Sequence, residues 1–146
     1  MYLLYTPYVY TADEGKDWAQ FNLGITYLRG EDGFDKNLPE AAKYTQMAVE
    51  KGYVRAQYQL GYLYEEGLGV PQDWEKSFHW YLKAANQGYA MAQNNVGTAF
   101  YLGKGIEKDM DQAFIWYKKS ADLGDDVAQY NLGKNESVYM YHIAVC

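Results

Sequence analysis

The segment EEGLGVPQD at residues 65–73 holds two glycines, Gly67 and Gly69, in the kind of short loop that can cradle a phosphate. A phosphate-binding loop normally follows a strand, opens a helix and occurs as a single feature. The GLGV sequence instead follows a helical block, and it returns as GKGI at 103–106 and loosely as GEDGF at 30–34. A turn that recurs at a regular spacing is typical of a connection between helices, so we interpret these glycines as architecture and not as a nucleotide site.

Other side chains capable of chemistry are few and scattered along the chain. His79 and His142 are the only two histidines, and neither the metal-binding pattern HExxH nor a CxxC pair occurs. Cys146 is the single cysteine. Glu65 and Glu66 are adjacent on a predicted helix, so they do not face each other as an acid and base pair would. The sequence therefore predicts no metal, no cofactor and no catalytic residue.

Length and charge exclude further classes of function. The chain has 146 residues, enough for one domain with a buried core, and a formal net charge of −6. An acidic chain without a basic block argues against nucleic-acid binding, which depends on lysine and arginine. No apolar run approaches the roughly 20 residues of a membrane-spanning helix. The start, MYLLYTPYVY, lacks the basic region and cleavage site of a secretory signal, so a cytoplasmic location is favoured for the chain as given.

Two blocks of sequence alternate along the chain with a period of 36 or 37 residues. The first block begins with Ala-Gln and contains a glycine five residues after the alanine: AQFNLGITYLRG (19–30), AQYQLGYLYEEG (56–67), AQNNVGTAFYLG (92–103) and AQYNLGK (128–134). The second block ends in glycine: EAAKYTQMAVEKG (40–52), KSFHWYLKAANQG (76–88) and QAFIWYKKSADLG (112–124). Small and apolar residues recur at helical spacing in both blocks, so each period is predicted to be a pair of helices.

The start and stop signals agree with this division into helices. Asn37, Asp73 and Asp109 precede the second helix of each pair and are good N-cap residues. Glycines close both helices: the first loop glycine, such as Gly67, is expected to end the first helix, and Gly52 and its equivalents suit the left-handed position after the second.

A further glycine lies inside the first helix of every period, at Gly24, Gly61, Gly97 and Gly133. Each costs about 1 kcal/mol relative to alanine in a helix interior. A cost accepted four times in register predicts that another helix approaches closely at each of these positions.

The segment AQYQLGYLYEEGLGVPQDWEKSFHWYLKAANQGY resembles the Sel-1-like repeat, an α/α relative of the tetratricopeptide repeat. The matching positions are Ala56, Leu60, Gly61, Tyr64, Gly67, Gly69, Val70, Asp73, Trp80, Tyr81, Ala84, Ala85 and Gly88. The period favours this family over tetratricopeptide repeats proper, which run about 34 residues. The resemblance extends over most of the chain. It implies an all-α fold, an α/α solenoid or superhelix of antiparallel helix pairs.

The resemblance implies one solenoid domain over residues 1–146, with three full repeats and a partial repeat at each end. The expected repeats are 17–52, 54–88, 90–124 and the partial 126–146, preceded by a capping helix over 6–15 that Thr6 and Pro7 would start.

The C-terminal end departs from the repeat. Glu136 and Tyr139 replace an aromatic residue and a glycine of the earlier repeats, and VYMYHIAVC ends apolar. Either the fourth repeat is cut short, by truncation, frameshift or divergence, or these residues form a helix that folds back on the third repeat. An exposed apolar end is expected to favour self-association.

By the same resemblance, the chain is expected to be a noncatalytic adaptor or scaffold that holds a peptide or another protein in a concave groove lined by the first helices. In tetratricopeptide relatives the groove positions lie just before and just after the Leu-Gly pair. The corresponding residues are Phe21, Asn22, Ile25, Tyr58, Gln59, Tyr62, Asn94, Asn95, Thr98, Tyr130 and Asn131, with Lys134 in the incomplete repeat.

Four amides form a column through these positions: Asn22, Gln59, Asn95 and Asn131. A carboxamide both donates and accepts, so it can bind the backbone of an extended peptide without reading its sequence. The same amides can instead hydrogen-bond a neighbouring helix, and residue identity does not separate the two. Two other functions stay open: a hydrolase acting on envelope or peptide material at a site between repeats, and a fragment whose function lies in missing repeats.

Overall fold

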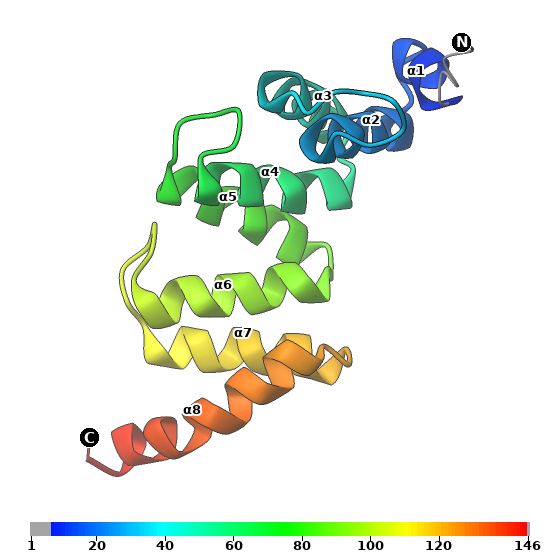
Figure 1. Cartoon of the computed structure of the whole chain (residues 1–146). Coiled ribbons are helices and arrows are strands. Elements are labelled where there is room, and N and C mark those ends of the chain that lie inside the picture. The colour runs from blue at the N-terminus through cyan, green and yellow to red at the C-terminus, as the bar shows by residue number, and fades with distance from the viewer. Residues whose placement is uncertain (1–6, 146) are drawn as a thin grey trace. The chain divides into compact units, whose positions relative to one another are not determined.

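The computed structural model describes residues 7–145, and within that range it contains eight α-helices and no strand (Figure 1). The helices are α1 (Pro7–Asp13), α2 (Asp17–Arg29), α3 (Leu38–Glu50), α4 (Val54–Glu66), α5 (Trp74–Asn86), α6 (Ala90–Leu102), α7 (Met110–Asp122) and α8 (Asp126–Val145). The predicted all-α fold is confirmed. The chain divides into two compact units, residues 1–73 and 74–146, each of which is a stack of packed helices.

In the first unit, α2 and α3 pack against each other, α1 covers α2, and α4 packs on α3. The core of the outermost layer is made of Ala12 from α1 and of Ala19 and Leu23 from α2. Tyr27 and Phe34 pack against this cluster, with ring centroids 5.1 Å apart and nearly perpendicular planes. The predicted start of α1 at Thr6 lies outside the described residues, and the helix is described from Pro7.

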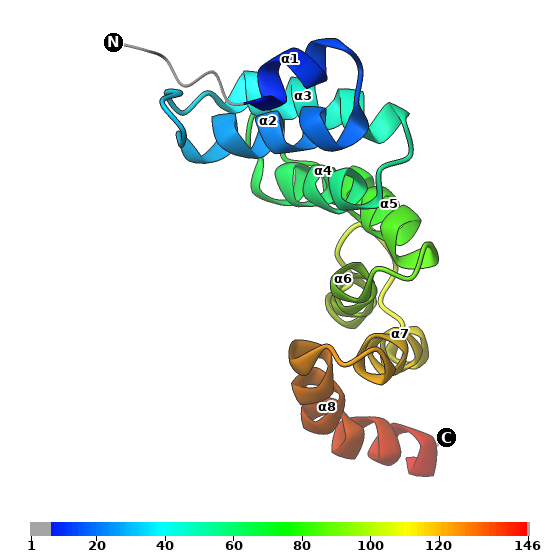
Figure 2. The same cartoon turned by 90° about the vertical axis from the view of Figure 1, so that its right-hand side faces the viewer.

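In the second unit, α6 and α7 run antiparallel side by side, α5 packs on α6, and α8 packs on α7 (Figures 1 and 2). Its core includes the fully buried Ala92 and Val96 of α6, which face the buried Trp116 and Tyr117 of α7. The residues of the apolar C-terminal stretch continue α8 as one helix to Val145. That helix diverges from α7 along its length in both views.

Helix ends form where the sequence predicts them. Asn37 accepts a hydrogen bond from the backbone N–H of Glu40 at 3.2 Å. Asp109 accepts one from the backbone N–H of Gln112 at 2.9 Å. Each bond satisfies one of the backbone donors that a helix start leaves unpaired. Gly67 closes α4 in the left-handed region at φ 66°, and its equivalents close α2 and α6 in the same way.

Two of the in-helix glycines lie where a second helix comes close, as predicted. A Cβ added to Gly24 would lie 2.8 Å from Thr45 Oγ1, and one added to Gly97 would lie 2.8 Å from the ring of Tyr117. The prediction is wrong for Gly133, where an added Cβ would meet no described atom within 4 Å. The reason is that α8 continues past this point, so the chain does not turn back to place a second helix against it.

The second glycine of a loop can make a close contact that the sequence did not predict. A Cβ at Gly69 would overlap the backbone carbonyl of Leu38, and one at Gly105 would overlap that of Trp74. Each loop therefore lies directly on the first turn of the second helix of the preceding repeat. Gly33, in the first repeat, has the same left-handed backbone, yet its Cβ would meet no described atom within 4 Å.

The glutamine of each Ala-Gln pair also has a recurring structural role. Its side-chain amide reaches back eight residues and donates to a carbonyl in the last turn of the preceding helix, from Gln20 to Ala12, Gln93 to Ala85 and Gln129 to Ala121. Each of these carbonyls also accepts from the backbone N–H of the glycine three residues on, which is Gly15, Gly88 or Gly124. The glutamine adds a second bond and links the end of one helix to the next helix.

Candidate functional site

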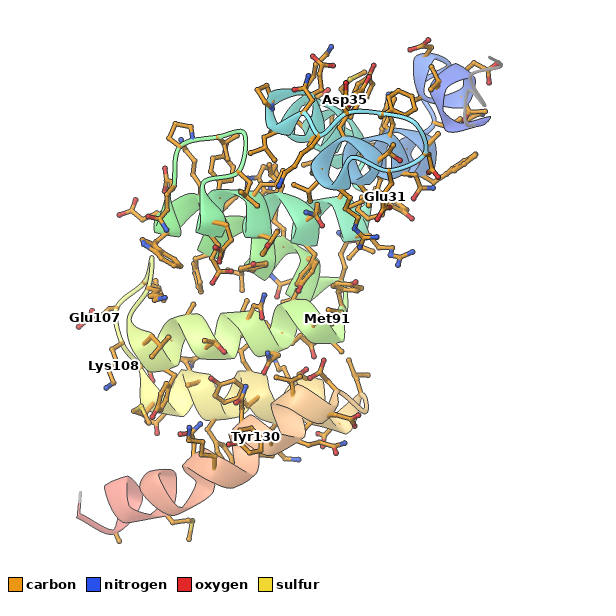
Figure 3. All side chains as sticks on the ribbon, viewed as in Figure 1. Glu31, Asp35, Met91, Glu107, Lys108 and Tyr130 are labelled. Atoms are coloured by element: carbon orange, nitrogen blue, oxygen red, sulfur yellow. The ribbon has the colours of Figure 1, made fainter. Side chains whose placement is uncertain are left out.

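The predicted groove positions lie on α2, α4, α6 and α8 but differ in how much of each side chain solvent can reach. Tyr130 is 67% exposed and Tyr62 38% exposed, whereas Phe21 and Asn94 are buried. Figure 3 shows Tyr130 on α8, the last helix of the second unit. The remaining predicted residues are half-buried: Asn22, Ile25, Tyr58, Gln59, Asn95, Thr98 and Asn131.

A pocket of about 330 Å³ lies in the first unit between α2, α4 and the loops that follow them. We call it the α2–α4 pocket, and its lining residues are Ile25, Leu28, Arg29, Lys36, Gln59, Tyr62 and Leu68. Three of the predicted residues, Ile25, Gln59 and Tyr62, meet here, so the structure brings this part of the predicted set together.

The α2–α4 pocket is lined by two cations, and none of the described residues that line it is acidic. Arg29 has an ion pair with Glu31 at 3.7 Å, but both side chains are more than half exposed, so the pair contributes little. Lys36 makes no ion pair within the described part of the chain. Its ammonium group is therefore available beside the pocket.

Gln59 gives the α2–α4 pocket a polar donor without an acceptor. The amide nitrogen of its side chain is buried and has no hydrogen-bond partner within residues 7–145. An unsatisfied buried donor costs about 1–3 kcal/mol. The hydrogen bonding of this groove amide is thus incomplete within the described residues.

A second pocket, of about 220 Å³, lies in the second unit between α6, α7 and α8. We call it the α6–α8 pocket, and its lining residues are Thr98, Tyr101, Leu102, Tyr117, Asn131, Lys134 and Asn135. It contains the predicted residues Thr98, Asn131 and Lys134. The two pockets correspond in part, because Gln59 and Asn131 are equivalent in the repeat, as are Ile25 and Thr98.

Three polar side chains of the α6–α8 pocket, Thr98, Tyr117 and Asn131, take part in hydrogen bonds within the second unit. Asn131 donates from its side-chain nitrogen to the side-chain oxygen of Asn94 at 2.9 Å. The hydroxyl of Thr98 donates to the Asn94 backbone carbonyl at 3.1 Å, and it lies 3.1 Å from the hydroxyl of Tyr117, where either oxygen can be the donor. Burial raises the pKa of Tyr117 and the hydrogen bond with Thr98 lowers it, and the net direction is a rise.

The hydrogen bond of Asn131 bears on the predicted amide column. Its partner is Asn94, which is one position away from the column residue Asn95. At this position the amide bonds a neighbouring helix, which is the alternative that the sequence left open. Whether the other amides contact a partner stays a prediction.

Several lining residues were missed by sequence reasoning, among them Arg29, Lys36 and Leu68 of the first pocket and Tyr117 and Asn135 of the second. Lys36 and Leu68 lie in two different loops between paired helices, and the path of each loop depends on how its backbone packs. In the loop of Leu68 that path depends on Gly69. Arg29 carried a usable signal, because it stands four residues after Ile25 on the same helix face.

The described residues contain no group of three histidine, cysteine, aspartate or glutamate side chains that could hold a metal ion. None of their helices is both long and apolar enough to cross a membrane. Self-association through the C-terminal end stays a prediction.

Comparison with known proteins identifies a repeat family along the chain. The family model of the Sel1 repeat matches residues 19–53, 54–89, 90–125 and 126–143. Curated relatives include chitin synthase regulatory factor 3 of Schizosaccharomyces pombe, 37% identical over 79 residues, and chitin synthase regulator SKT5 of Saccharomyces cerevisiae, 38% identical over 79 residues. These matches cover 52% and 53% of this chain but only 8% and 11% of the two regulators.

Solved structures share the fold over most of the chain. A protective antigen of uropathogenic Escherichia coli with an SLR fold is 35% identical at a TM-score of 0.85, over 88% of this chain and 27% of that one. A Sel1 repeat protein from Oxalobacter formigenes is 39% identical at a TM-score of 0.78, over 87% of this chain and 95% of that one. Helicobacter pylori cysteine rich protein B is 25% identical at a TM-score of 0.67, over 86% and 89% of the two chains. The predicted α/α solenoid class is confirmed.

Proposed function

Because the chain belongs to the Sel1 repeat family, we propose that it is a noncatalytic adaptor that binds a peptide or protein along the groove formed by its first helices. The repeat is typical of protein-interaction scaffolds, and two curated relatives carry the name of regulators of chitin synthase. The chain spans about a tenth of the length of these regulators, so the proposal does not extend to the enzyme that they regulate.

One observation carries the proposal of the groove. The α2–α4 and α6–α8 pockets occupy equivalent positions of the repeat, and both contain residues of the predicted groove. Each of these pockets offers a site to a side chain of an extended segment, whose side chains point alternately to its two sides. Amides and tyrosines at the rim, such as Gln59 and Tyr62, bind a backbone and add contact area without any chemical reaction.

The proposal is tested by affinity capture with three baits, using the native extract and mass spectrometry. The first bait is the natural chain, and the second carries Gln59→Ala, Tyr62→Ala and Asn95→Ala in the groove. The third is a matched control with Lys43→Ala, Ile115→Ala and Lys118→Ala, three exposed residues of the second helices.

Circular dichroism first establishes that all three baits are equally helical. We expect a partner that the natural chain and the control retain and that the groove variant loses. Equal capture by all three baits would place binding elsewhere on the surface. A hydrolase activity in a broad substrate screen, abolished by a change at one residue that does not recur in the repeats, would contradict the noncatalytic assignment.

A further inference from the structure

We propose that the α2–α4 pocket binds the carboxylate of a glutamate side chain in an extended acidic segment of the partner. This inference rests on the proposed function, because it names the chemistry of the segment that the groove would hold. It assigns the contact to the first unit and to three residues there, Arg29, Lys36 and Gln59.

The charge of the pocket opposes the charge of the whole chain. The chain has a formal net charge of −6, whereas the described lining of the α2–α4 pocket has two cations and no acid. Glu31 and Asp35 belong to the same loop as Lys36, but they are exposed and do not line the pocket. Salt screens the repulsion between an anionic group in the pocket and distant acidic residues of the chain. The two nearby cations therefore determine the local attraction.

The unpaired amide of Gln59 indicates where a carboxylate oxygen would lie. In the equivalent position Asn131 donates to Asn94, but the residue that corresponds to Asn94 in the first repeat is Phe21, which has no side-chain acceptor. The buried nitrogen of Gln59 is therefore left without a partner. Because this nitrogen is buried in the free chain, the Gln59 side chain has to turn its amide toward the pocket, where a carboxylate can then accept from it and from the ammonium of Lys36.

The apolar part of the lining favours glutamate over aspartate. Ile25, Leu28 and Leu68 form the rest of the wall, next to the cations. The additional methylene of glutamate extends the apolar contact and brings the carboxylate further into the pocket. A buried methylene is worth about threefold to fourfold in affinity, so glutamate is expected to bind more tightly by about that factor.

The α6–α8 pocket does not offer the same site. Its residues Asn131, Thr98 and Tyr117 already take part in hydrogen bonds, and Lys134 is the one cation among its described lining residues. An anion there would have to displace existing hydrogen bonds. The carboxylate site is therefore assigned to the first unit alone.

The test uses the full chain labelled with ¹⁵N and three synthetic peptides, followed by nuclear magnetic resonance. The peptides have blocked ends and alternate alanine with glutamate, with glutamine or with aspartate. We expect the glutamate peptide to shift the side-chain amide signals of Gln59 in a saturable way, because that group acquires an acceptor. The glutamine peptide should leave them in place, and the aspartate peptide should bind about threefold more weakly. The signals are assigned by their loss in Gln59→Leu.

Variants separate the pocket from the general charge of the surface. Binding to the variants is followed by the backbone amide signals, since Gln59→Leu lacks the side-chain signal. Lys36→Gln and Gln59→Leu should each weaken binding of the glutamate peptide about tenfold, because each removes one charge-assisted hydrogen bond. Lys51→Gln makes the same change of charge at an exposed lysine after α3 that does not line the pocket, so it should change binding less than twofold. Thermal unfolding of each variant establishes that the fold is kept.

The outcomes that overturn the inference differ from those that overturn the proposed function. Equal shifts with the glutamate and glutamine peptides would exclude recognition of the carboxylate while leaving peptide binding in the groove intact. Equal weakening by Lys36→Gln and Lys51→Gln would reduce the effect to unspecific attraction. No shift up to about 10 mM glutamate peptide, an affinity weaker than about 3 kcal/mol, would also overturn the inference. The capture experiment decides the proposed function independently of these results.

Discussion

The α2–α4 and α6–α8 pockets share several positions of the repeat, yet they differ in what they leave unsatisfied. In the second unit Asn94 gives Asn131 an acceptor at 2.9 Å. In the first unit Phe21 stands in the place of Asn94, and the amide of Gln59 has no acceptor within the described chain. One residue of the first helix in the preceding repeat thus decides whether this amide has an acceptor without a ligand.

This difference shows how a solenoid can combine a uniform frame with individual sites. The frame depends on residues that recur, such as Gly24 and Gly97 at close helix contacts. The polar character of each pocket depends on residues that do not recur, such as Phe21 and Asn94. Substitutions at the frame are therefore expected to change stability strongly, and substitutions at the individual positions to change it little while altering binding.

The largest effect is expected from the loop that carries Leu68 to the α2–α4 pocket. Gly69→Ala places a methyl group on the carbonyl of Leu38 in addition to straining a left-handed backbone at φ 72°. We expect a loss of about 3 kcal/mol in the free energy of unfolding, measured with urea, from the sum of strain and overlap. Gly33→Ala is the matched control, since it has the strain without the overlap and should lose about 1 kcal/mol. Equal losses would show that this loop does not rest on α3.

The next prediction compares the stability effects of two glycine-to-alanine substitutions, one in α6 and one in α8. Gly97→Ala in α6 brings a methyl group to 2.8 Å from the ring of Tyr117, so we expect a loss of about 2 kcal/mol. Gly133→Ala in α8 meets no described atom within 4 Å, and it should instead stabilise the protein by about 0.5–1 kcal/mol because alanine favours the helix. Thermal unfolding measures both. Destabilisation by Gly133→Ala would mean that another element covers this face of α8.

Much of the frame could be predicted from the sequence, because it depends on local rules that repeat. The caps at Asn37 and Asp109, and the left-handed glycines after the helices, follow from the preferences of single residues. The close contacts at Gly24 and Gly97 followed from their register alone. The same rule failed at Gly133, because its partner helix depends on a chain reversal that the residues beyond it do not make.

The candidate site was predicted only in part, because it depends on contacts between repeats. Ile25, Gln59 and Tyr62 were selected by their place in the repeat, and they do share a pocket. The cations differ between the pockets, with Arg29 and Lys36 in the first and Lys134 in the second. They were not predicted as a group, because the position of Lys36 depends on the path of a loop. The partner of Asn131 was also not predictable, because the bond crosses to a helix 37 residues away in sequence.

A smaller effect tests the two amides directly. Asn131→Ala should cost about 1 kcal/mol of unfolding free energy, because it leaves Asn94 without its donor. Gln59→Leu removes a buried donor that has no acceptor, so it should leave stability unchanged or raise it slightly. A double-mutant cycle with Asn94→Ala should yield a coupling of about 1 kcal/mol with Asn131→Ala. If Gln59→Leu destabilised the chain as much as Asn131→Ala, the contrast between the pockets would not hold.

The last effect appears only in alkaline solution and concerns Tyr117. Burial is the main reason that its pKa lies above the ordinary 10.0, while the hydrogen bond with Thr98 acts against the rise. Above pH 10.0 the unfolded chain begins to lose this proton and the folded chain retains it. Stability from this group is therefore complete below pH 10.0 and is lost as the pH rises through the higher folded value. Tyr117→Phe should lose less stability than the natural chain between about pH 8 and about pH 11 in urea unfolding. Tyr101→Phe, which changes a tyrosine of the same pocket, is the control that should leave most of the alkaline loss of stability in place. An equal loss in the natural chain and in Tyr117→Phe would show that the fold does not hold this phenol protonated.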